Sequence, residues 1–190
     1  CMAQKADLPE HMGYAGRALP YGEVRVMTSD TEEAAPGELG EIWMRGAPVT
    51  PGYWNRPDAT EDAFAGDWLK SGDIGRRDDT GRLSVEDRIK DMYISGGENV
   101  YPAEVESVLM AHPDIKEVAV IGVADAKWGE VGCAVIASIS GDPISLDTVH
   151  SQCDGNLAKF KWPQQVTHTD ALPRNSTGKV QKFILRQEHA

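Results

Sequence analysis

The first half of the chain contains short stretches in which apolar and polar residues alternate. Such alternation is typical of strands that are buried on one face only. We expect strands at residues 23–28, 38–45, 68–70 and 82–85. Turn residues separate these stretches, with Pro36-Gly37 before the second strand and Asp-Asp-Thr-Gly at 78–81 between the last two. Pro57 begins a short predicted helix that runs to Phe64, so this half is expected to be a small β-rich part.

The second half changes to longer apolar runs and to helical spacing. Pro102 predicts a helix start, and Pro113 predicts the end of that helix. After it we expect strands at residues 115–123 and 131–139, a helix at 145–157, a strand at 165–168 and a helix at 180–184. This order predicts a compact α+β unit of about 100 residues. The change of pattern falls near residue 90, so the fold class expected for the whole chain is α+β.

Charge is distributed unevenly along the 190 residues. The formal net charge is −11, from 19 Lys and Arg against 30 Asp and Glu, which disfavours a nucleic-acid partner. Residues 155–190 are the exception, because they hold six basic and two acidic side chains. A basic tail of this kind is either a solvated helix face or a surface that meets an anionic small molecule such as a nucleotide.

Cysteine and histidine give no sign of a disulfide framework or of a bound metal. Cys1, Cys133 and Cys153 are odd in number and form no C-x-x-C motif, which fits a reducing, cytoplasmic compartment. The histidines are scattered, so no protein-bound metal is expected. No apolar run has the length of a membrane span and no secretory signal is visible, so we expect no integral membrane segment.

Four stretches could carry chemistry, although each has a purely structural interpretation. Asp73 follows Ser-Gly and could accept hydrogen bonds from a ribose diol or cap a turn. A charge cluster occupies 87–91, and its structural interpretation is a surface turn. Gly96-Gly97 predicts either an ordinary strand-to-helix turn or a place where the backbone lets a ligand approach closely. The loop before Lys179 is rich in Gly, Ser and Thr but lacks the P-loop spacing, so it is a linker or it presents one cation to an anion.

Together, in this order and spacing, these stretches resemble the adenylate-forming superfamily of acyl-CoA synthetases and related enzymes. Four segments carry the resemblance. The first is Gly-Glu-Leu-Gly-Glu-Ile with Gly-Tyr-Trp, from residue 37, and the second is Trp…Ser-Gly-Asp, from residue 68. The third is Asp-Arg-Ile-Lys-Asp with Gly-Gly-Glu-Asn-Val-Tyr-Pro, from residue 87, and the fourth is Pro…Gly-Lys, from residue 173. The resemblance covers nearly the whole chain. Its third segment is the most specific.

The resemblance also implies which part of such an enzyme this chain represents. The family's phosphate loop and adenine-site motif lie upstream and are absent here. We therefore expect residues 1–89 to be the β-barrel-like end of the AMP-binding N-terminal domain. Residues 90–190 are expected to be the small C-terminal lid domain, with a hinge at Lys90 and with the remaining N-terminal domain as its partner.

The family joins a carboxylic acid to a thiol in two half-reactions that consume ATP. The acid first forms an acyl-AMP with release of pyrophosphate, and the thiol of coenzyme A then displaces AMP. By resemblance, Lys179 is the catalytic lysine, Asp73 binds the ribose diol and Arg88 contacts ribose or phosphate. ATP is expected to bring Mg²⁺ mainly through its phosphates.

The same resemblance assigns the coenzyme A side of the site. The loop Gly96-Gly97-Glu98 would face the pantetheine channel, where a side chain would block passage. Trp128 and Phe160 match positions that contact the coenzyme A nucleotide in some aryl-CoA ligases, and their alternative interpretation is core packing. Two departures are Ser71, where threonine is commoner, and Trp162, where some relatives carry a basic residue.

Three interpretations stay open from the sequence. The first is the C-terminal part of an acyl-CoA synthetase acting on a fatty or aryl carboxylic acid. The second is an adenylation domain of the peptide-synthetase type, and the third is a binding module without activity. Because the triphosphate cradle and the acyl pocket are absent, we expect this chain alone to be inactive.

Overall fold

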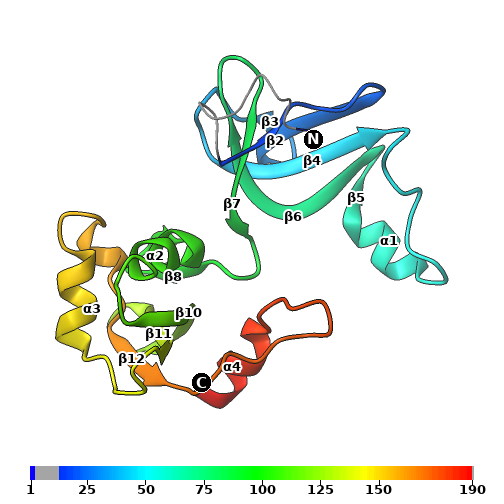
Figure 1. Ribbon diagram of the computed structural model, residues 1–190. Helices are drawn as coiled ribbons and strands as arrows, with labels where there is room; N and C mark the ends of the chain where they lie inside the picture. The colour runs from blue at the N-terminus through cyan, green and yellow to red at the C-terminus, as the bar shows by residue number, and fades with distance from the viewer. Residues whose placement is uncertain (3–12, 190) are drawn as a thin grey trace. The chain divides into compact units, whose positions relative to one another are not determined.

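The computed structural model describes residues 1–2 and 13–189, and the chain divides into two compact units, Cys1–Lys90 and Asp91–Ala190. Figure 1 shows the order of helices and strands along the chain. Strands dominate the first unit, and helices and strands mix in the second. The predicted α+β class is confirmed. None of the helices among the described residues is long and apolar enough to cross a lipid bilayer.

The first unit is built on an antiparallel sheet with described strand order β1-β7-β6-β4-β2-β3, to which β5 adds beside β6. Its elements are β1 (Tyr14–Gly16), β2 (Gly22–Ser29), β3 (Glu32–Glu33), β4 (Gly40–Gly46), α1 (Pro57–Ala63), β5 (Phe64–Ala65), β6 (Trp68–Arg77) and β7 (Leu83–Arg88). The predicted strands at 23–28, 38–45 and 82–85 are confirmed to within a few residues. The strand predicted at 68–70 continues to Arg77 and so contains the Ser-Gly-Asp stretch.

Alternation along β2 and β4 produces two apolar clusters. Val26 and Ile42 pack in one cluster, while their neighbours Met27 and Trp43 pack in the other with Trp68. Neighbouring residues of a strand point to opposite faces, so the sheet contributes buried side chains on both faces.

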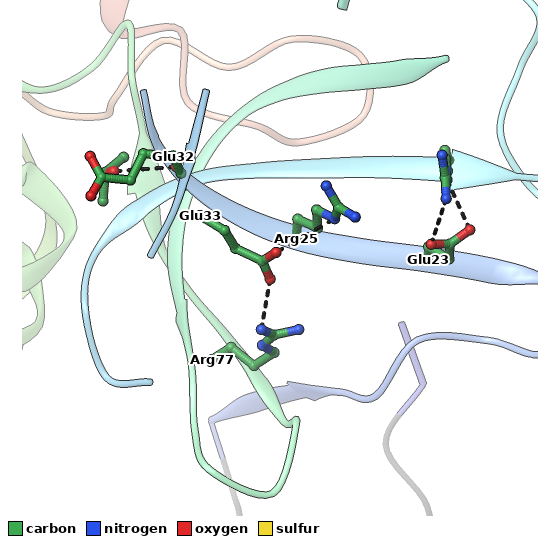
Figure 2. Close-up of polar contacts among 7 residues, drawn as sticks. Glu23, Arg25, Glu32, Glu33 and Arg77 are labelled. Atoms are coloured by element: carbon green, nitrogen blue, oxygen red, sulfur yellow. Dashed lines mark hydrogen bonds and ion pairs between the residues drawn. The ribbon is translucent and has the colours of Figure 1, made fainter. Parts of the chain in front are cut away.

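Charged side chains surround part of this sheet. The Glu33 carboxylate accepts a hydrogen bond from Arg77 at 2.7 Å and lies 3.5 Å from the Arg25 guanidinium (Figure 2). The guanidinium groups of Arg25 and Arg45 each lie 4.6 Å from the centre of the Trp68 ring. Paired arginines here cover an aromatic ring with their planar groups while acidic neighbours balance their charge.

The predicted turn between β6 and β7 is present and is organised by one side chain. Asp78 Oδ1 accepts hydrogen bonds from the backbone N–H groups of Thr80 and Arg82. Burial opposes ionisation of Asp78, but these bonds and the nearby Arg82 charge together keep its pKa below the usual value. The Asp-Asp-Thr-Gly sequence therefore folds as a local hairpin turn.

The second unit has a mixed sheet with described order β10-β11-β8-β9, and β12 pairs with β11 in parallel. Its elements are β8 (Tyr93–Ser95), β9 (Glu98–Val100), α2 (Pro102–Leu109), β10 (Ile115–Asp125), β11 (Gly129–Ser138), α3 (Leu146–Cys153), the 3₁₀ turn η2 (Lys159–Lys161), β12 (Gln165–His168) and α4 (Lys182–His189). All six elements predicted after residue 100 are present.

Helices cover both faces of this sheet, which explains the long apolar runs of β10 and β11. Val118 and Val120 pack with α2 and α3, whereas Ala119 and Ile121 pack with α4 through Leu185. A strand buried on both faces carries consecutive apolar residues rather than an alternating pattern.

Two local predictions for this unit are wrong. The glycines at 96 and 97 do not join a strand to a helix, because they connect β8 to β9 as a tight hairpin. Val180 lies before α4 rather than on it and forms an isolated bridge with Arg174. Within α4 the buried residue is Leu185, whereas Phe183 is exposed.

Candidate functional site

The Ser71-Gly72-Asp73 stretch forms a bulge inside β6, not the separate turn that the sequence suggested. Lys70 pairs with Trp43 and Ile74 pairs with Glu41, so the three residues between them oppose a single residue of β4. Gly72 has a φ of 71°, which favours glycine. A bulge redirects the side chains that it carries, and here it sets the direction of Asp73.

Asp73 and Arg88, two residues predicted to bind a nucleotide, are brought together by the pairing of β6 with β7. The Arg88 Nε lies 3.2 Å from Asp73 Oδ1, and the Arg88 side chain is half exposed. An exposed ion pair of this type contributes about 0–1 kcal/mol. Either partner can therefore exchange the other for a ligand at small cost.

An open cavity of about 470 Å³ lies beside this pair within the first unit. Ser71 and Gly72 line it together with the cations Lys70, Arg88 and Lys90. Asp73 itself does not line the cavity, but Gly72 before it and Arg88 opposite it on β7 do. The carboxylates of Glu41 and Asp62 also line the cavity, so its three cations leave an excess of one positive charge, which suits an anionic ligand.

Lys179 lies on an exposed loop between β12 and α4 whose backbone is hydrogen bonded from end to end. Asn175 Oδ1 accepts from the backbone N–H groups of Thr177 and Lys179, at 3.0 and 2.9 Å. Asn175 N–H in turn donates to the Lys179 carbonyl at 2.9 Å, and Gly178 turns the chain with a φ of 83°. The loop is therefore a built structure and not a loose linker.

The base of this loop is attached to β10 through one ion pair. Arg174 donates to the Gly178 carbonyl at 2.7 Å and to Glu117 Oε1 at 2.6 Å. The bond from Arg174, helped by the Leu172 N–H, holds the pKa of Glu117 below its usual value. The Lys179 ammonium itself has no hydrogen bond or ion pair with any residue that the structure describes.

The hairpin between β8 and β9 shows why glycine occupies its two turn positions. Gly96 and Gly97 have φ values of 61° and 89°, the left-handed conformation of a two-residue hairpin turn. A Cβ on Gly96 would lie 2.9 Å from the Trp128 ring, and the Gly96 N–H donates to the Trp128 carbonyl at 2.9 Å. Gly97 has open space around it. The hairpin and Trp128 therefore form one packed surface.

A second cavity, of about 320 Å³, lies over this surface in the second unit. Gly96, Glu98, Trp128 and Phe160, all predicted from the sequence, line it together. Trp128 and Phe160 are 47% and 41% exposed, so the interpretation of these rings as core residues is wrong. Two exposed rings beside a cavity offer stacking surfaces for a planar ligand.

Sequence reasoning missed several residues that complete these cavities. Lys159 and Gln164 line the second cavity, and Glu41 lines the first. Asp125 Oδ1 accepts from the backbone N–H groups of Lys127 and Trp128, both at 2.8 Å, and so holds the turn that carries Trp128. An Asp three residues before Trp128 was the available signal for that turn.

Trp162, one of the two departures from the family pattern, has a structural explanation, and its neighbour Lys161 is held in place as well. Trp162 is a packing residue, because its indole N–H donates to the Leu157 carbonyl and its ring lies 5.3 Å from that of His150. Lys161 is held by both carboxylate oxygens of Glu104, at 2.7 and 2.8 Å. Neither residue lines the second cavity. Among the described residues, no group of three or more His, Cys, Asp or Glu side chains could hold a metal ion.

Comparisons with known proteins give a family model and several relatives for this chain. Residues 104–179 match the family model described as the AMP-binding enzyme C-terminal domain. The long-chain-fatty-acid–CoA ligase FadD13 of Mycobacterium tuberculosis is 45% identical over 184 residues, which are 97% of this chain and 36% of that protein. The indoleacetate–CoA ligase of Aromatoleum aromaticum is 42% identical over 96% of this chain and 36% of its own length.

Solved structures show the same likeness in three dimensions. The o-succinylbenzoate CoA synthetase MenE of Bacillus subtilis, solved with the acyl-adenylate OSB-AMP, matches with a TM-score of 0.88 and 40% identity. That match covers 98% of this chain and 37% of MenE. ATP-bound MatB of Rhodopseudomonas palustris matches with a TM-score of 0.86 and 42% identity, over 93% of this chain and 35% of MatB.

The fold and these matches define the class of this chain, which carries the C-terminal domain of AMP-binding enzymes at residues 104–179. The chain belongs to the adenylate-forming superfamily, and its relatives include acyl-CoA and aryl-CoA ligases. It spans about 36% of the length of the curated relatives that it matches.

Proposed function

We propose that this chain is the C-terminal portion of an ATP-dependent acyl-CoA synthetase that acts on a fatty or aryl carboxylic acid. In the first half-reaction, a carboxylate oxygen attacks the α-phosphorus of ATP and pyrophosphate leaves. In the second, the sulfur of coenzyme A attacks the acyl carbonyl, and AMP leaves with the bonding electrons. The observation that carries this proposal is the exposed Lys179 ammonium, which has no partner among the described residues and stands on a hydrogen-bonded loop.

Lys179 is the group that we assign to the first half-reaction. Negative charge gathers between the attacking carboxylate and the α-phosphate, and a fixed cation stabilises that charge more in the transition state than before it. A lysine is suited to this role because its charge is compact and its stem is long. The hydrogen-bonded loop around Asn175 supports this role, since a preformed loop loses little entropy when the cation engages.

Asp73 and Arg88 are proposed to hold the nucleotide. A carboxylate can accept both hydroxyl hydrogens of a ribose diol, and a guanidinium can donate to ribose or phosphate oxygens. Their exposed ion pair beside the cationic cavity supports this assignment. Mg²⁺ is proposed to be bound mainly through the ATP phosphates rather than by side chains of this chain.

The division of the chain supports the proposed domain organisation. The two compact units separate between Lys90 and Asp91, where we place the hinge between the end of the AMP-binding domain (1–89) and the lid (90–190). A single residue can absorb the backbone rotation of a moving domain. We propose that this rotation alternates the Lys179 loop and the Gly96-Gly97 hairpin at the reaction centre.

Coenzyme A is proposed to bind over the second cavity. Trp128 and Phe160 would stack on its adenine. Gly96 and Glu98 line this cavity, Gly97 does not, and the three together would border the pantetheine arm. The two exposed rings favour a thiol that carries a nucleotide over the carrier-protein thiol used by peptide-synthetase adenylation domains.

The test is Lys179→Ala in the complete protein, with each half-reaction measured separately. We expect acyl-AMP formation to fall by about 10²–10³-fold, the usual effect of removing one charge-stabilising group. Thioester formation from supplied acyl-AMP should change only a few-fold. Lys116→Ala, which removes an exposed lysine outside both cavities, is the control and should leave both rates unchanged. Equal losses in both half-reactions for the Lys179 variant would contradict its assignment.

The 190-residue chain provides a second test. We expect it to show no ATP–pyrophosphate exchange by itself, because no triphosphate cradle is present in its sequence. Robust exchange by the purified chain would contradict the proposal that it is one portion of a larger active site.

A further inference from the structure

Glu41 has both carboxylate oxygens engaged inside the first unit. Its Oε1 accepts a hydrogen bond from the Gly72 backbone N–H at 3.0 Å, and its Oε2 accepts from the Trp43 indole N–H at 2.9 Å. Glu41 lies on β4, opposite the β6 bulge that contains Gly72. A part-buried carboxylate with two donors is a strong acceptor because both hydrogen bonds are charge-assisted.

The backbone of Gly72 is held both at its N–H and at its carbonyl, which belong to two successive peptide groups. Glu41 accepts from its N–H, and the Gly72 carbonyl accepts from the Ile89 N–H at 2.9 Å. Gly72 thereby links β4 to the end of β7, although it stands in the middle of β6. Asp73 follows it directly, and Lys90 follows Ile89.

The ordinary strand ladder cannot provide the bond that Glu41 provides. The register between β4 and β6 shifts at this point, so the bulge residues have no one-to-one partner on β4. A bulge peptide without a partner would be free to rotate, and its N–H would lose a hydrogen bond in a part-buried place. A side chain from the neighbouring strand is the substitute here.

We propose that Glu41 is a positioning residue of the nucleotide site, which fixes the Gly72 backbone and through it the Asp73 carboxylate and the Ile89-Lys90 segment that follows β7. The inference rests on the proposed role of Asp73 as the ribose ligand. Glu41 lines the same cavity as Arg88 and Lys90 but has no free oxygen pointing to a ligand. Its negative charge would also repel a nucleotide phosphate, so its contribution is to orient other groups.

The experiment measures how well the complete protein distinguishes ATP from 2′-deoxyATP, as the ratio of kcat/KM in acyl-AMP formation. A carboxylate that holds both ribose hydroxyls makes this ratio large, and a misplaced carboxylate brings it toward one. In Glu41→Met, which keeps the chain length but accepts no hydrogen bond, we expect the ratio to fall about tenfold. The KM for ATP should rise, while thioester formation from supplied acyl-AMP stays within a few-fold.

Two further variants separate positioning from general packing. Trp43→Phe removes one donor to Glu41 but leaves the Gly72 bond, so its ratio should remain near that of the unmodified protein. Glu41→Gln keeps one acceptor for two donors, and its ratio should lie between those of Glu41→Met and the unmodified protein. If Glu41→Met does not fold, Glu41→Leu decides, because it also accepts no hydrogen bond and an unchanged ratio in it overturns the proposal. A loss in Trp43→Phe as large as in Glu41→Met also overturns it.

Asp73→Ala distinguishes a failure of this inference from a failure of the proposed function. If Asp73→Ala lowers the ratio and Glu41→Met does not, the role of Glu41 is wrong and that of Asp73 stands. If Asp73→Ala leaves the ratio unchanged, the ribose assignment itself is wrong and the inference falls with it.

Discussion

At the scale of single residues, the two glycines of the β8–β9 hairpin are glycines for different reasons. Both have positive φ, but only Gly96 faces a neighbouring side chain, the ring of Trp128. The sequence interpretation gave both glycines one role, as free space for a passing ligand. The structure adds that Gly96 also packs against the Trp128 ring.

This difference predicts unequal effects of alanine at the two positions. Gly97→Ala should cost about 1 kcal/mol of unfolding free energy from backbone strain alone. Gly96→Ala should cost more and should shift the Trp128 ring, because its Cβ would lie 2.9 Å from that ring. Urea unfolding gives the two costs, and tryptophan fluorescence reports the shift. Equal costs with unchanged fluorescence would mean that Trp128 does not pack on Gly96.

Asn175 is the residue that shapes the Lys179 loop, since its one side-chain oxygen serves two backbone N–H groups. Asn175→Ala should speed amide hydrogen exchange at Lys179, because each lost hydrogen bond of this kind is worth about 1 kcal/mol. Asn175→Asp keeps the acceptor and should keep the protection. Exchange at Thr167, in β12, serves as the internal reference and should not change in either variant.

At the scale of elements, helix α3 illustrates a local rule that the chain obeys. Ser145 precedes the helix and its Oγ accepts from the Thr148 N–H at 3.1 Å. Ser145→Ala should therefore lower the unfolding free energy by about 1 kcal/mol. Ser151→Ala is the matched control within the same helix, because its hydroxyl only donates to the Asp147 carbonyl. Chemical denaturation of both variants tests this, and a larger loss for Ser151→Ala would contradict the capping role.

At the scale of the whole molecule, each unit contains its own buried clusters. The two clusters of the second unit lie on opposite faces of one sheet and draw only on residues 93–185. We therefore expect Asp91–Ala190 produced alone to unfold cooperatively, with a melting temperature close to that of its transition in the whole chain. Calorimetry of the isolated unit checks this, and a broad transition without a heat-absorption peak would contradict it.

The second unit should also lose stability in acid. The pKa of Glu117 is lowered by its bond to Arg174, and that of Asp114 is lowered by its bonds to Ser140. A carboxyl with a lower pKa in the folded state stabilises the fold above its unfolded pKa, and this contribution disappears as the pH falls through the folded pKa. Melting temperatures should therefore decline below about pH 4.5, the usual value for Glu117. Arg174→Gln should flatten that decline, and an unchanged slope would contradict the assignment.

Local patterns in the sequence were enough to predict most of the elements. Alternation predicted β2 and β4, consecutive apolar runs predicted β10 and β11, and Ser145 predicted the start of α3. These features depend on residues a few positions apart, so they can be interpreted without a fold. The order of the family motifs likewise identified the superfamily, because it is a property of the sequence alone.

Only the tertiary structure decided how the site residues are held. The Glu41–Gly72 bond joins residues 31 positions apart, and the Arg174–Glu117 pair spans 57 positions. Neither bond follows from periodicity or local propensity, because each depends on which strands become neighbours and in what register. The same reason applies to the bulge at Ser71-Gly72-Asp73 and to the exposure of Trp128. Chain pattern determined which groups this protein carries, and strand pairing determined where those groups point.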